Sequence, residues 1–521
     1  MELGTRYQAG TIFREERLLM SSFSYTSYDA IGLAELIRSR EVSPVELLEA
    51  AFARLEEVNP QLNAVIRTYE TRARQEATNV RPGEQPFAGV PLLLKDISQS
   101  LEGEFLTSGS RLFSEHRALR NSNFVTRLLE AGFIVIGHTN TPEFGLKNIT
   151  EPRLHGPTRN PWNVNHSPGG SSGGAAAAVA SGIVPLAGAS DGGGSIRIPA
   201  SFSGLFGLKP TRGRTPVGPG VGRQWQGASI DFAVSRSVRD SAALLDTLQI
   251  IQPEAAFHTP LFPGSYLADM NYPHQRKWRI AYTTDSPVGT PVSEEAEEAV
   301  MKLVRFLEAQ GHHVEEKLSP VNGVRLMENY YMMNSGEMAA MISSMEHGLG
   351  RSLTADDMEI ESWVLTEAGK KVSAAEFVHS LAEWDVAAAQ MSRLFERYDF
   401  YITPVNAFPA PRVGELTPHA EQIQHLMTIS DLDKTAQQEL IYEMFKPSLT
   451  YTPFTQLANL TGQPAISLPL HLTADGLPMG VQVMATKGRE DWLLHLAGQL
   501  ESTELWVGME ANPMFPTSTK A

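Results

Sequence analysis

Two segments rich in glycine and serine lie close together in the chain and are suited to nucleophilic chemistry. Residues 168–174 read Pro-Gly-Gly-Ser-Ser-Gly-Gly, and residues 190–197 read Ser-Asp-Gly-Gly-Gly-Ser-Ile-Arg. Glycine permits tight turns and lets a ligand approach backbone N–H groups closely. The three glycines before Ser195 therefore predict convergent N–H donors, which an oxyanion hole requires.

Two other interpretations of these loops are weaker. Glycine-rich turns also bind phosphate, but neither Gly-x4-Gly-Lys-Ser/Thr nor Gly-x-Gly-x-x-Gly occurs in this region. The Gly-x-Ser-x-Gly pattern of α/β-hydrolases occurs around Ser171 and around Ser190. Such an enzyme would also need a catalytic histidine later in the chain, and no later histidine lies in a glycine-rich loop that marks a catalytic turn.

A serine hydrolase without a catalytic histidine needs another base, and Lys95 is the candidate. It ends the run Gly89-Val-Pro-Leu-Leu-Leu-Lys95, which predicts a strand that is buried on both faces. Burial would lower the pKa of the amine, so that it is neutral near working pH and can accept a proton. The alternative is a lysine that reaches the surface from the strand end or pairs with Asp96.

Longer motifs in and around these segments resemble the signature of the amidase signature family. The central block consists of Gly169-Gly-Ser-Ser-Gly-Gly, Asp191-Gly-Gly-Gly-Ser-Ile-Arg and Gly207-Leu-Lys-Pro-Thr211. The lysine strand also matches, and so do Thr107-Ser-Gly-Ser, Thr139-Asn-Thr-Pro-Glu-Phe-Gly145, Arg159-Asn-Pro-Trp and Leu460-Thr-Gly-Gln-Pro-Ala-Ile-Ser-Leu-Pro469. The resemblance covers roughly residues 25–505 and is weakest over 245–445.

The resemblance implies a catalytic triad and a fold. Ser195 would be the nucleophile, Lys95 the base, and Ser171, with a cis peptide bond, the relay between them. The oxyanion would be bound by N–H groups around Gly192, Gly193 and Gly194. Neutral Lys95 would take a proton through Ser171 as Ser195 attacks the amide carbonyl, and water would then hydrolyse the acyl-enzyme. The implied fold is α/β, a twisted mixed sheet with helices on both faces.

Within this family, the sequence looks most like the branch that contains 6-aminohexanoate cyclic-dimer hydrolases and related bacterial amidases. The features that carry this are Ser190-Asp-Gly-Gly-Gly-Ser, Arg212-Gly-Arg and Gly218-Pro-Gly-Val-Gly222. The expected substrate is a small, partly apolar, linear or cyclic amide. The alternatives are a glutamyl-tRNA amidotransferase A-type subunit and an aryl-acylamide or carbamate hydrolase.

Several residues are predicted to contact the substrate. Asn148 lies in the loop after an expected strand at 133–137, where ligands commonly bind in α/β sheets; its amide could donate to and accept from a substrate, or merely close its own turn. The other candidates are Ser172, Trp225, Tyr330, Tyr331 and Met332. The methionines that surround Met332 are interpreted either as core filler or as a pliable lid over an apolar substrate.

Alternating strands and helices must position these side chains, which indicates an α/β fold. The sequence predicts two helices over 28–58, the second capped by Ser43 with Pro44 at its first position. It also predicts a helix over 121–131, a strand at Arg279–Tyr282 and a helix capped by Ser293. Residues 212–231 should form a long loop, and Asp475-Gly476 should turn a hairpin.

The chain is organised as one domain over 25–505, with a variable helical substrate lobe at about 318–445. Residues 1–24 are expected to be a polar extension, in which Met20 is a candidate natural start, and residues 506–521 a C-terminal tail. The 521 residues contain no cysteine, which excludes disulfides and thiolate metal sites and fits a reducing cytoplasm.

The surface charge and hydropathy limit the partners. The net charge of −16 disfavours a nucleic-acid partner, and no run of 18 apolar residues predicts a membrane span. The expected partners are a small amide and water, with no cofactor and no metal; a homodimer is left open.

Overall fold

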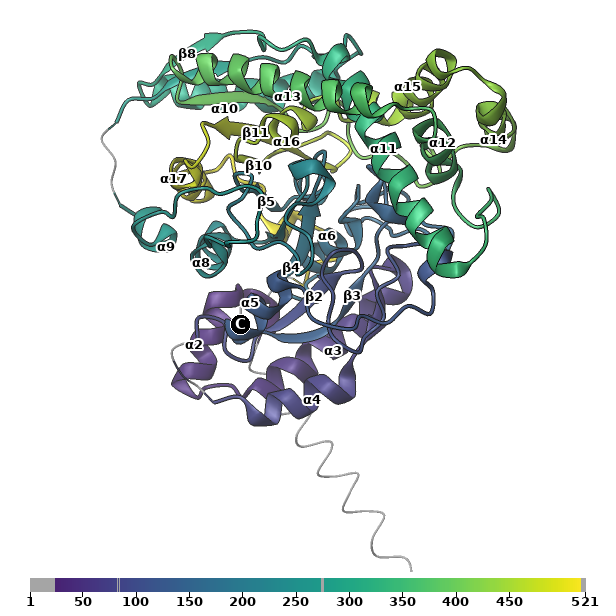
Figure 1. Ribbon diagram of the computed structural model, residues 1–521. Helices are drawn as coiled ribbons and strands as arrows, with labels where there is room; N and C mark the ends of the chain where they lie inside the picture. The colour runs from purple at the N-terminus through teal and green to yellow at the C-terminus, as the bar shows by residue number, and fades with distance from the viewer. Residues whose placement is uncertain (1–23, 82, 84, 273–275, 517–521) are drawn as a thin grey trace, which may run out of the picture.

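The computed structural model describes residues 24–81, 83, 85–272 and 276–516, which form an 11-stranded sheet surrounded by helices (Figure 1). Along the sheet the strands follow the order β1-β3-β2-β4-β6-β5-β10-β11-β9-β7-β8. The strands are β1 (Val65–Thr68), β2 (Pro91–Lys95), β3 (Ile134–Thr139), β4 (Leu186–Asp191), β5 (Phe206–Lys209), β6 (Ile230–Ser235), β7 (Arg279–Tyr282), β8 (His313–Glu316), β9 (Phe400–Pro404), β10 (Ala465–Leu472) and β11 (Pro478–Ala485).

The sheet is mixed, as expected. β2 pairs in parallel with β3 and β4, and β7 pairs in parallel with β8 and β9. The strands between these two groups pair antiparallel, and β1 pairs antiparallel with β3 at one edge. Parallel neighbours need a crossover connection, which α5 supplies between β2 and β3 and α10 between β7 and β8.

The α-helices of the described residues lie mostly between these strands or after them. They are α2 (Ala30–Ser39), α3 (Pro44–Leu62), α4 (Glu70–Asn79), α5 (Asn123–Glu130), α6 (Gly173–Ala180), α7 (Arg197–Phe202), α8 (Val238–Leu248), α9 (Tyr266–Asp269), α10 (Glu294–Ala309), α11 (Gly323–Leu349), α12 (Ile360–Gly369), α13 (Ala374–Phe395), α14 (Ala420–Leu426), α15 (Lys434–Tyr451), α16 (Gln456–Thr461) and α17 (Glu490–Glu501). Short 3₁₀ helices are η2 (Tyr25–Ser27), η3 (Arg111–Phe113), η4 (Glu143–Gly145), η5 (Trp225–Gly227), η6 (Met427–Asp431) and η7 (Met509–Ala511).

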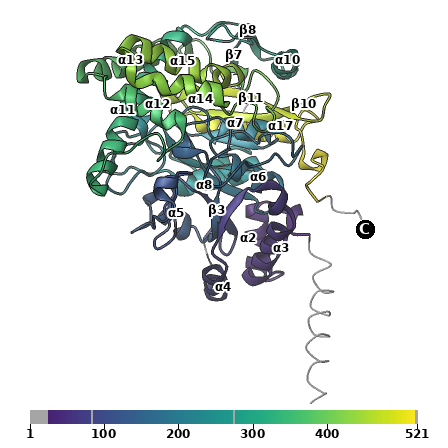
Figure 2. The same cartoon turned by 90° about the vertical axis from the view of Figure 1, so that its right-hand side faces the viewer.

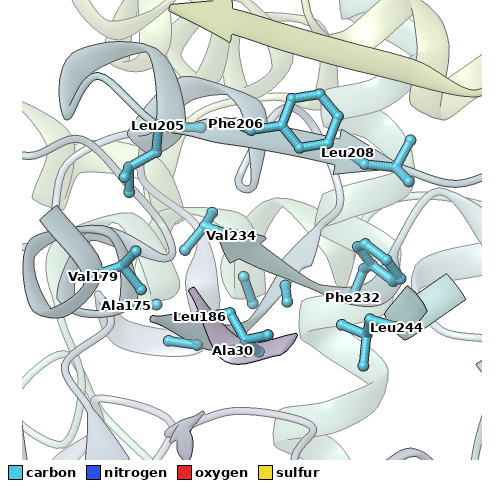
Figure 3. Close-up of a cluster of buried hydrophobic side chains, with 14 of the residues drawn as sticks. Ala30, Ala175, Val179, Leu186, Leu205, Phe206, Leu208, Phe232, Val234 and Leu244 are labelled. Atoms are coloured by element: carbon cyan, nitrogen blue, oxygen red, sulfur yellow. The ribbon is translucent and has the colours of Figure 1, made fainter. Parts of the chain in front are cut away.

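Both faces of the sheet are covered by other elements. Alternate residues of a strand point to opposite faces, so neighbouring residues of one strand pack in different clusters. In β9, Phe400 and Ile402 belong to the main core, whereas Tyr401 between them packs in a separate cluster with Trp384 of α13. Figure 3 shows part of the main core, where Val179 of α6 and Leu244 of α8 lie near strand residues such as Val234. The predicted α/β fold with helices on both faces is therefore confirmed.

The elements predicted from sequence patterns are present near their expected bounds. Ser43 caps α3 with a capping box to Glu46, Ser293 caps α10, and β7 has the predicted bounds. Within the predicted 212–231 loop, the structure adds the turn η5 and the start of β6.

A helical lobe made of α11, α12, α14 and α15 stands beside the sheet (Figures 1 and 2). It has its own core, which includes Met327, Met338 and Phe445. The range 318–445 predicted for the substrate lobe also contains β9, so the lobe helices are interrupted by a strand of the central sheet.

The two ends of the chain differ in what the structure describes. The extension predicted over 1–24 lies outside the described residues except for Ser24. After α17 the chain stays docked, since Asn512 Nδ2 donates to the carbonyl of Ala180 at 2.8 Å. Across the described part of the chain, no helix combines the length and the apolar character that a bilayer crossing needs.

Candidate active site

Three segments bring the predicted triad residues to one edge of the sheet. Lys95 ends β2, Ser171 lies in the loop before α6, and Ser195 lies between β4 and α7. Because β2 and β4 are parallel neighbours, with Leu93 opposite Ala187, their carboxyl ends meet at the same edge. Loops at such an edge are the usual place for ligand sites in α/β sheets.

Lys95 is fully buried and reaches two serines. Its Nζ donates to Ser171 Oγ at 2.7 Å and to Ser190 Oγ at 2.9 Å. It does not take either alternative position, since it neither reaches the surface nor pairs with Asp96. The carboxylate of Asp96 instead accepts from the backbone N–H of Thr107 at 2.8 Å.

The environment of Lys95 favours the neutral amine. Burial lowers the pKa of Lys95 from its usual 10.5 to about 7, and the charges of Asp231 and Asp191 oppose this only in part. Among the described residues no carboxylate forms an ion pair with Lys95. A neutral lysine near pH 7 can accept a proton from a hydroxyl at hydrogen-bond distance.

Ser171 is held by its backbone, and its peptide bond with Gly170 is cis. The carbonyl of Ser171 accepts from Thr141 Oγ1 at 2.9 Å. Gly145 lies against its hydroxyl, because an added Cβ on Gly145 would stand 3.3 Å from Ser171 Oγ. The hydroxyl therefore sits between Lys95 and the loop at Gly145.

The loop that carries Ser195 is fixed by a buried ion pair. The carboxylate of Asp191 accepts from Gly194 N–H at 2.7 Å and lies 2.9 Å from Arg197 Nη2. Asn459 Nδ2 donates to the same carboxylate at 2.8 Å. Although burial disfavours the charged carboxyl, these partners hold the pKa of Asp191 down to about 2.

The structure corrects the prediction for one of the three oxyanion glycines. The N–H of Gly194 is committed to Asp191, so it is not available to a ligand, and Gly194 does not line the cavity described below. Gly192 and Gly193 do line it. Their carbonyls accept from Tyr330 Oη at 3.0 Å and from Thr455 Oγ1 at 2.7 Å, which fixes the orientation of this loop.

Ser172 is also placed differently from the prediction. Its hydroxyl is fully buried and exchanges hydrogen bonds with the backbone of Ser190, donating to the carbonyl at 3.2 Å and accepting from the N–H at 3.3 Å. It does not line the cavity. Ser172 thus ties the two serine loops together and is not a substrate contact.

A cavity of about 590 Å³ opens at Lys95, Ser171 and Ser195. Its far walls are apolar and come mainly from the helical lobe and the loops at 113, 144 and 225. These walls include Phe113, Phe144, Leu146, Trp225, Met327, Tyr330, Tyr331, Met341, Met345, Phe445 and Leu449. The volume and the mixed lining are typical of a site for a small organic molecule.

The predicted pocket residues fall into two groups. Trp225, Tyr330, Tyr331 and Asn148 line the cavity, but Met332 does not. Successive residues of a helix point about 100° apart, so Met332 leaves the face of α11 that carries its neighbours. Of the methionines nearby, Met327, Met341 and Met345 line the cavity, while Met338 is fully buried in the core of the lobe.

Strained backbone also gathers around the cavity. Ser98, Ser108, Phe144 and Trp225 line it and have positive φ angles of 63°, 52°, 51° and 49°. Non-glycine residues rarely adopt this region, and they concentrate at functional sites where the surrounding structure holds them.

Comparison with known proteins identifies the family. A family model described as Amidase matches residues 46–494. The chain belongs to the amidase signature family. Amidases hydrolyse the carbon–nitrogen bonds of amides, so this amidase is a hydrolase of that type.

Three comparisons illustrate where this amidase stands. The lipoamidase of Enterococcus faecalis is 40% identical over 484 residues, which are 93% of this chain but 64% of the lipoamidase; the chain thus spans less than two thirds of that protein. The 6-aminohexanoate-cyclic-dimer hydrolase of Paenarthrobacter ureafaciens is 38% identical over 496 residues, which cover 94% of this chain and 97% of the hydrolase. A structure of 6-aminohexanoate cyclic dimer hydrolase complexed with substrate has a TM-score of 0.83 at 37% identity and covers 94% of this chain and 98% of that chain.

Sequence reasoning missed several residues of this amidase site. Ser190 belongs to two of the sequence motifs, but neither motif indicates that it accepts the second hydrogen bond from Lys95. Asp191 and Arg197 belong to the central family motif, but the motif alone does not reveal their ion pair. Asn459 and Gln456 lie before the matched segment that begins at Leu460, and their side-chain chemistry alone gives no signal of their place at this site.

Proposed function

We propose that this amidase hydrolyses amides of apolar, medium-length carboxylic acids through Lys95, Ser171 and Ser195. One observation carries the proposal: the buried Lys95 amine lies 2.7 Å from the Ser171 hydroxyl, in a cavity with a mixed lining whose far walls carry many apolar side chains. The names of the two relatives refer to lipoamide and to a cyclic dimer of 6-aminohexanoate, both of which contain apolar carbon chains.

The mechanism follows from the position of the proton acceptor. Neutral Lys95 accepts the proton of Ser171 while Ser171 takes the proton of Ser195, whose oxygen attacks the amide carbonyl. The N–H groups around Gly192 and Gly193 stabilise the oxyanion. The proton returns through Ser171 to the leaving nitrogen, the acyl group stays on Ser195, and water releases it by the reverse path. Ser190, the second acceptor of Lys95, keeps the amine oriented.

A matched series of amides tests the substrate class. With one amine portion held constant and the acyl chain lengthened from acetyl to octanoyl, kcat/KM should rise by about fourfold per methylene group until the cavity is filled, since each buried methylene contributes about 0.8 kcal/mol. Anilide, carbamate and glutamine arms of the same assay measure the alternative activities. A preference for glutamine or for acetyl amides would contradict the proposal.

The pH profile tests Lys95 as the base. Below its pKa the amine holds a proton and cannot accept another, so kcat/KM should fall about tenfold per pH unit below about pH 7 and level off above it. The measurement is kcat/KM on an uncharged amide from pH 5 to pH 9 at constant ionic strength. An activity that stays flat over this range, or falls as pH rises through 7, would count against a titrating lysine.

A further inference from the structure

The hydroxyl of Tyr330 reaches from the helical lobe to the loop that carries the nucleophile. Tyr330 lies on α11, and its Oη donates to the carbonyl of Gly192 at 3.0 Å. Gly192 and Gly193 line the cavity, as Ser195 does. One end of this loop is therefore held by a residue of the lobe and not by the sheet alone.

The carbonyl anchors of the loop determine where its N–H groups point. In a trans peptide the carbonyl of one residue and the N–H of the next point in opposite directions. The peptide between Gly193 and Gly194 shows this, because its carbonyl accepts from Thr455 Oγ1 at 2.7 Å while its N–H donates to Asp191 at 2.7 Å. In the peptide before it, Tyr330 holds the carbonyl. The N–H of Gly193 therefore points away from Tyr330, and no acceptor among the described residues takes it.

Gly193 leaves the space that this hydroxyl occupies. A Cβ added to Gly193 would stand 2.9 Å from Tyr330 Oη, which is too close, but at ordinary distances of 3.5 Å from Tyr330 Cζ and 3.7 Å from Gln456 Cγ. The backbone of Gly193 lies outside the left-handed region that favours glycine. The close approach of the hydroxyl, and not the backbone conformation, is thus what requires glycine at this position.

The lobe also fixes the hydroxyl of Tyr330. Burial raises the pKa of Tyr330, and the side chain of Asn334, one turn further along α11, opposes this in part as a hydrogen-bond partner of the phenol. Asn334 Oδ1 in turn accepts from Trp225 Nε1 at 2.6 Å. The phenol therefore stays a neutral donor, and Asn334 connects it to Trp225 on the apolar wall of the cavity.

We propose that Tyr330 is a positioning residue for the reaction. By holding the carbonyl of Gly192, it keeps the N–H of Gly193 directed at the oxyanion that forms when Ser195 attacks. Donors that are oriented before the reaction stabilise developing charge without the cost of reorganisation. The proposal rests on the function proposed above, and it means that α11, which lines the apolar part of the cavity, also orients a donor of the oxyanion hole.

Tyr330→Phe tests this role, because it removes the hydroxyl and keeps the ring on the cavity wall. We expect kcat to fall by about ten- to hundredfold, since a misdirected oxyanion donor costs up to the effect of deleting one, while KM changes by less than about twofold. The loss should be the same for an amide and for an activated ester of the same acid, because both pass through an oxyanion.

Tyr442→Phe is the matched control. Tyr442 lies half-buried on α15 of the same lobe, outside the cavity, and its hydroxyl makes no hydrogen bond within the described residues. Its replacement should change kcat by less than about twofold. A loss in Tyr330→Phe on the amide but not on the ester would overturn the positioning role, because it would make Tyr330 a proton donor to the leaving nitrogen. A raised KM at unchanged kcat would overturn it too, since Tyr330 would then only contact the substrate.

A double-mutant cycle gives a result that lost stability alone would not produce. Gly193→Ala places a methyl group against the hydroxyl of Tyr330, so by itself it should lower kcat about as much as Tyr330→Phe does. In the Tyr330→Phe background the same methyl group meets no oxygen, and it should lower kcat further by less than about twofold. Losses that multiply in the double variant would contradict the proposal.

The comparison of variants needs only one substrate that the wild-type protein turns over. If an activated ester is hydrolysed and the apolar amides are not, the proposed substrate class fails, and the ratios of kcat on the ester still decide the role of Tyr330. If the apolar amides are hydrolysed equally fast by the wild type and by Tyr330→Phe, the positioning role fails and the proposed function stands.

Discussion

Replacing Ser195 by alanine is expected to lower kcat by about a million-fold, the scale on which serine hydrolases respond to loss of the nucleophile. Alanine cannot form the acyl-enzyme, so only direct attack by water remains, assisted by the loop around Gly192 and Gly193. The measurement is steady-state turnover on the best amide of the series. Intact-protein mass spectrometry after rapid mixing should show an acyl adduct on the wild type and none on the variant.

Ser203→Ala is the matched control for this experiment. Ser203 is fully buried and follows α7 on the same segment, but its hydroxyl has no partner among the described residues and does not line the cavity. Its replacement should change turnover by less than about twofold, because no hydrogen bond is lost. An acyl adduct that maps to Ser171 or Ser190 would contradict the assignment of Ser195 as the nucleophile.

The parts of the site that the sequence predicted well are those determined by local structure. Glycines at 192–194 allow a tight loop whatever surrounds it, and an apolar run before Lys95 is enough to predict a buried strand end. The order of the strands in the sheet could not be predicted in this way. β5 pairs with β10, and the hydrophobic pattern of either strand fits many neighbours.

The predictions for Gly194 and Asn148 are wrong for different reasons. For Gly194 the reason is partly local, because its N–H donates to the carboxylate of Asp191 three residues earlier; only Asn459, which also donates to that carboxylate, is distant in the chain. The donor groups of Asn148 are used by Ser448 and Thr452, some 300 residues later. No local pattern reveals these contacts of Asn148, because they arise only when α15 packs beside it.

Met332 failed for a different reason. Its helix was predicted, and its neighbours Tyr330 and Tyr331 do line the cavity. Each step of one residue along an α-helix turns the side-chain direction by about 100°, so three consecutive residues cannot all face one cavity. Methionines lie both in the core of the lobe and on the cavity wall, and composition cannot tell these positions apart because both surfaces are apolar.

The buried pair of Asp191 and Arg197 connects stability with the chemistry. Both side chains are fully buried, and Arg197 also donates to the carbonyl of Thr455 at 2.8 Å. Thr455 in turn donates to Gly193. Buried pairs contribute little net stability but are costly to break. In this amidase the pair therefore fixes the loop of Ser195 more than it stabilises the fold.

Replacing Lys95 by methionine is expected to lower kcat on an amide by about 10²–10⁴-fold, the range for loss of a general acid–base group. Methionine keeps much of the length and apolar volume of the lysine stem, so the fully buried position stays filled, but no amine remains to hold the proton of Ser171. Lys487→Met is the matched control, because the pKa of Lys487 is also lowered by desolvation, while the residue is exposed and lies outside the cavity. It should keep near-normal turnover.

An activated ester of the same acid separates the two tasks assigned to Lys95. The amine of an amide must be protonated as it leaves, whereas a phenolate leaves without that help. The fold loss of turnover caused by Lys95→Met should therefore be at least about tenfold smaller for the ester than for the amide. Equal losses on both substrates would mean that Lys95 only activates Ser195 and that the leaving nitrogen takes its proton from elsewhere. Near-normal turnover of the amide by Lys95→Met would remove Lys95 from the mechanism.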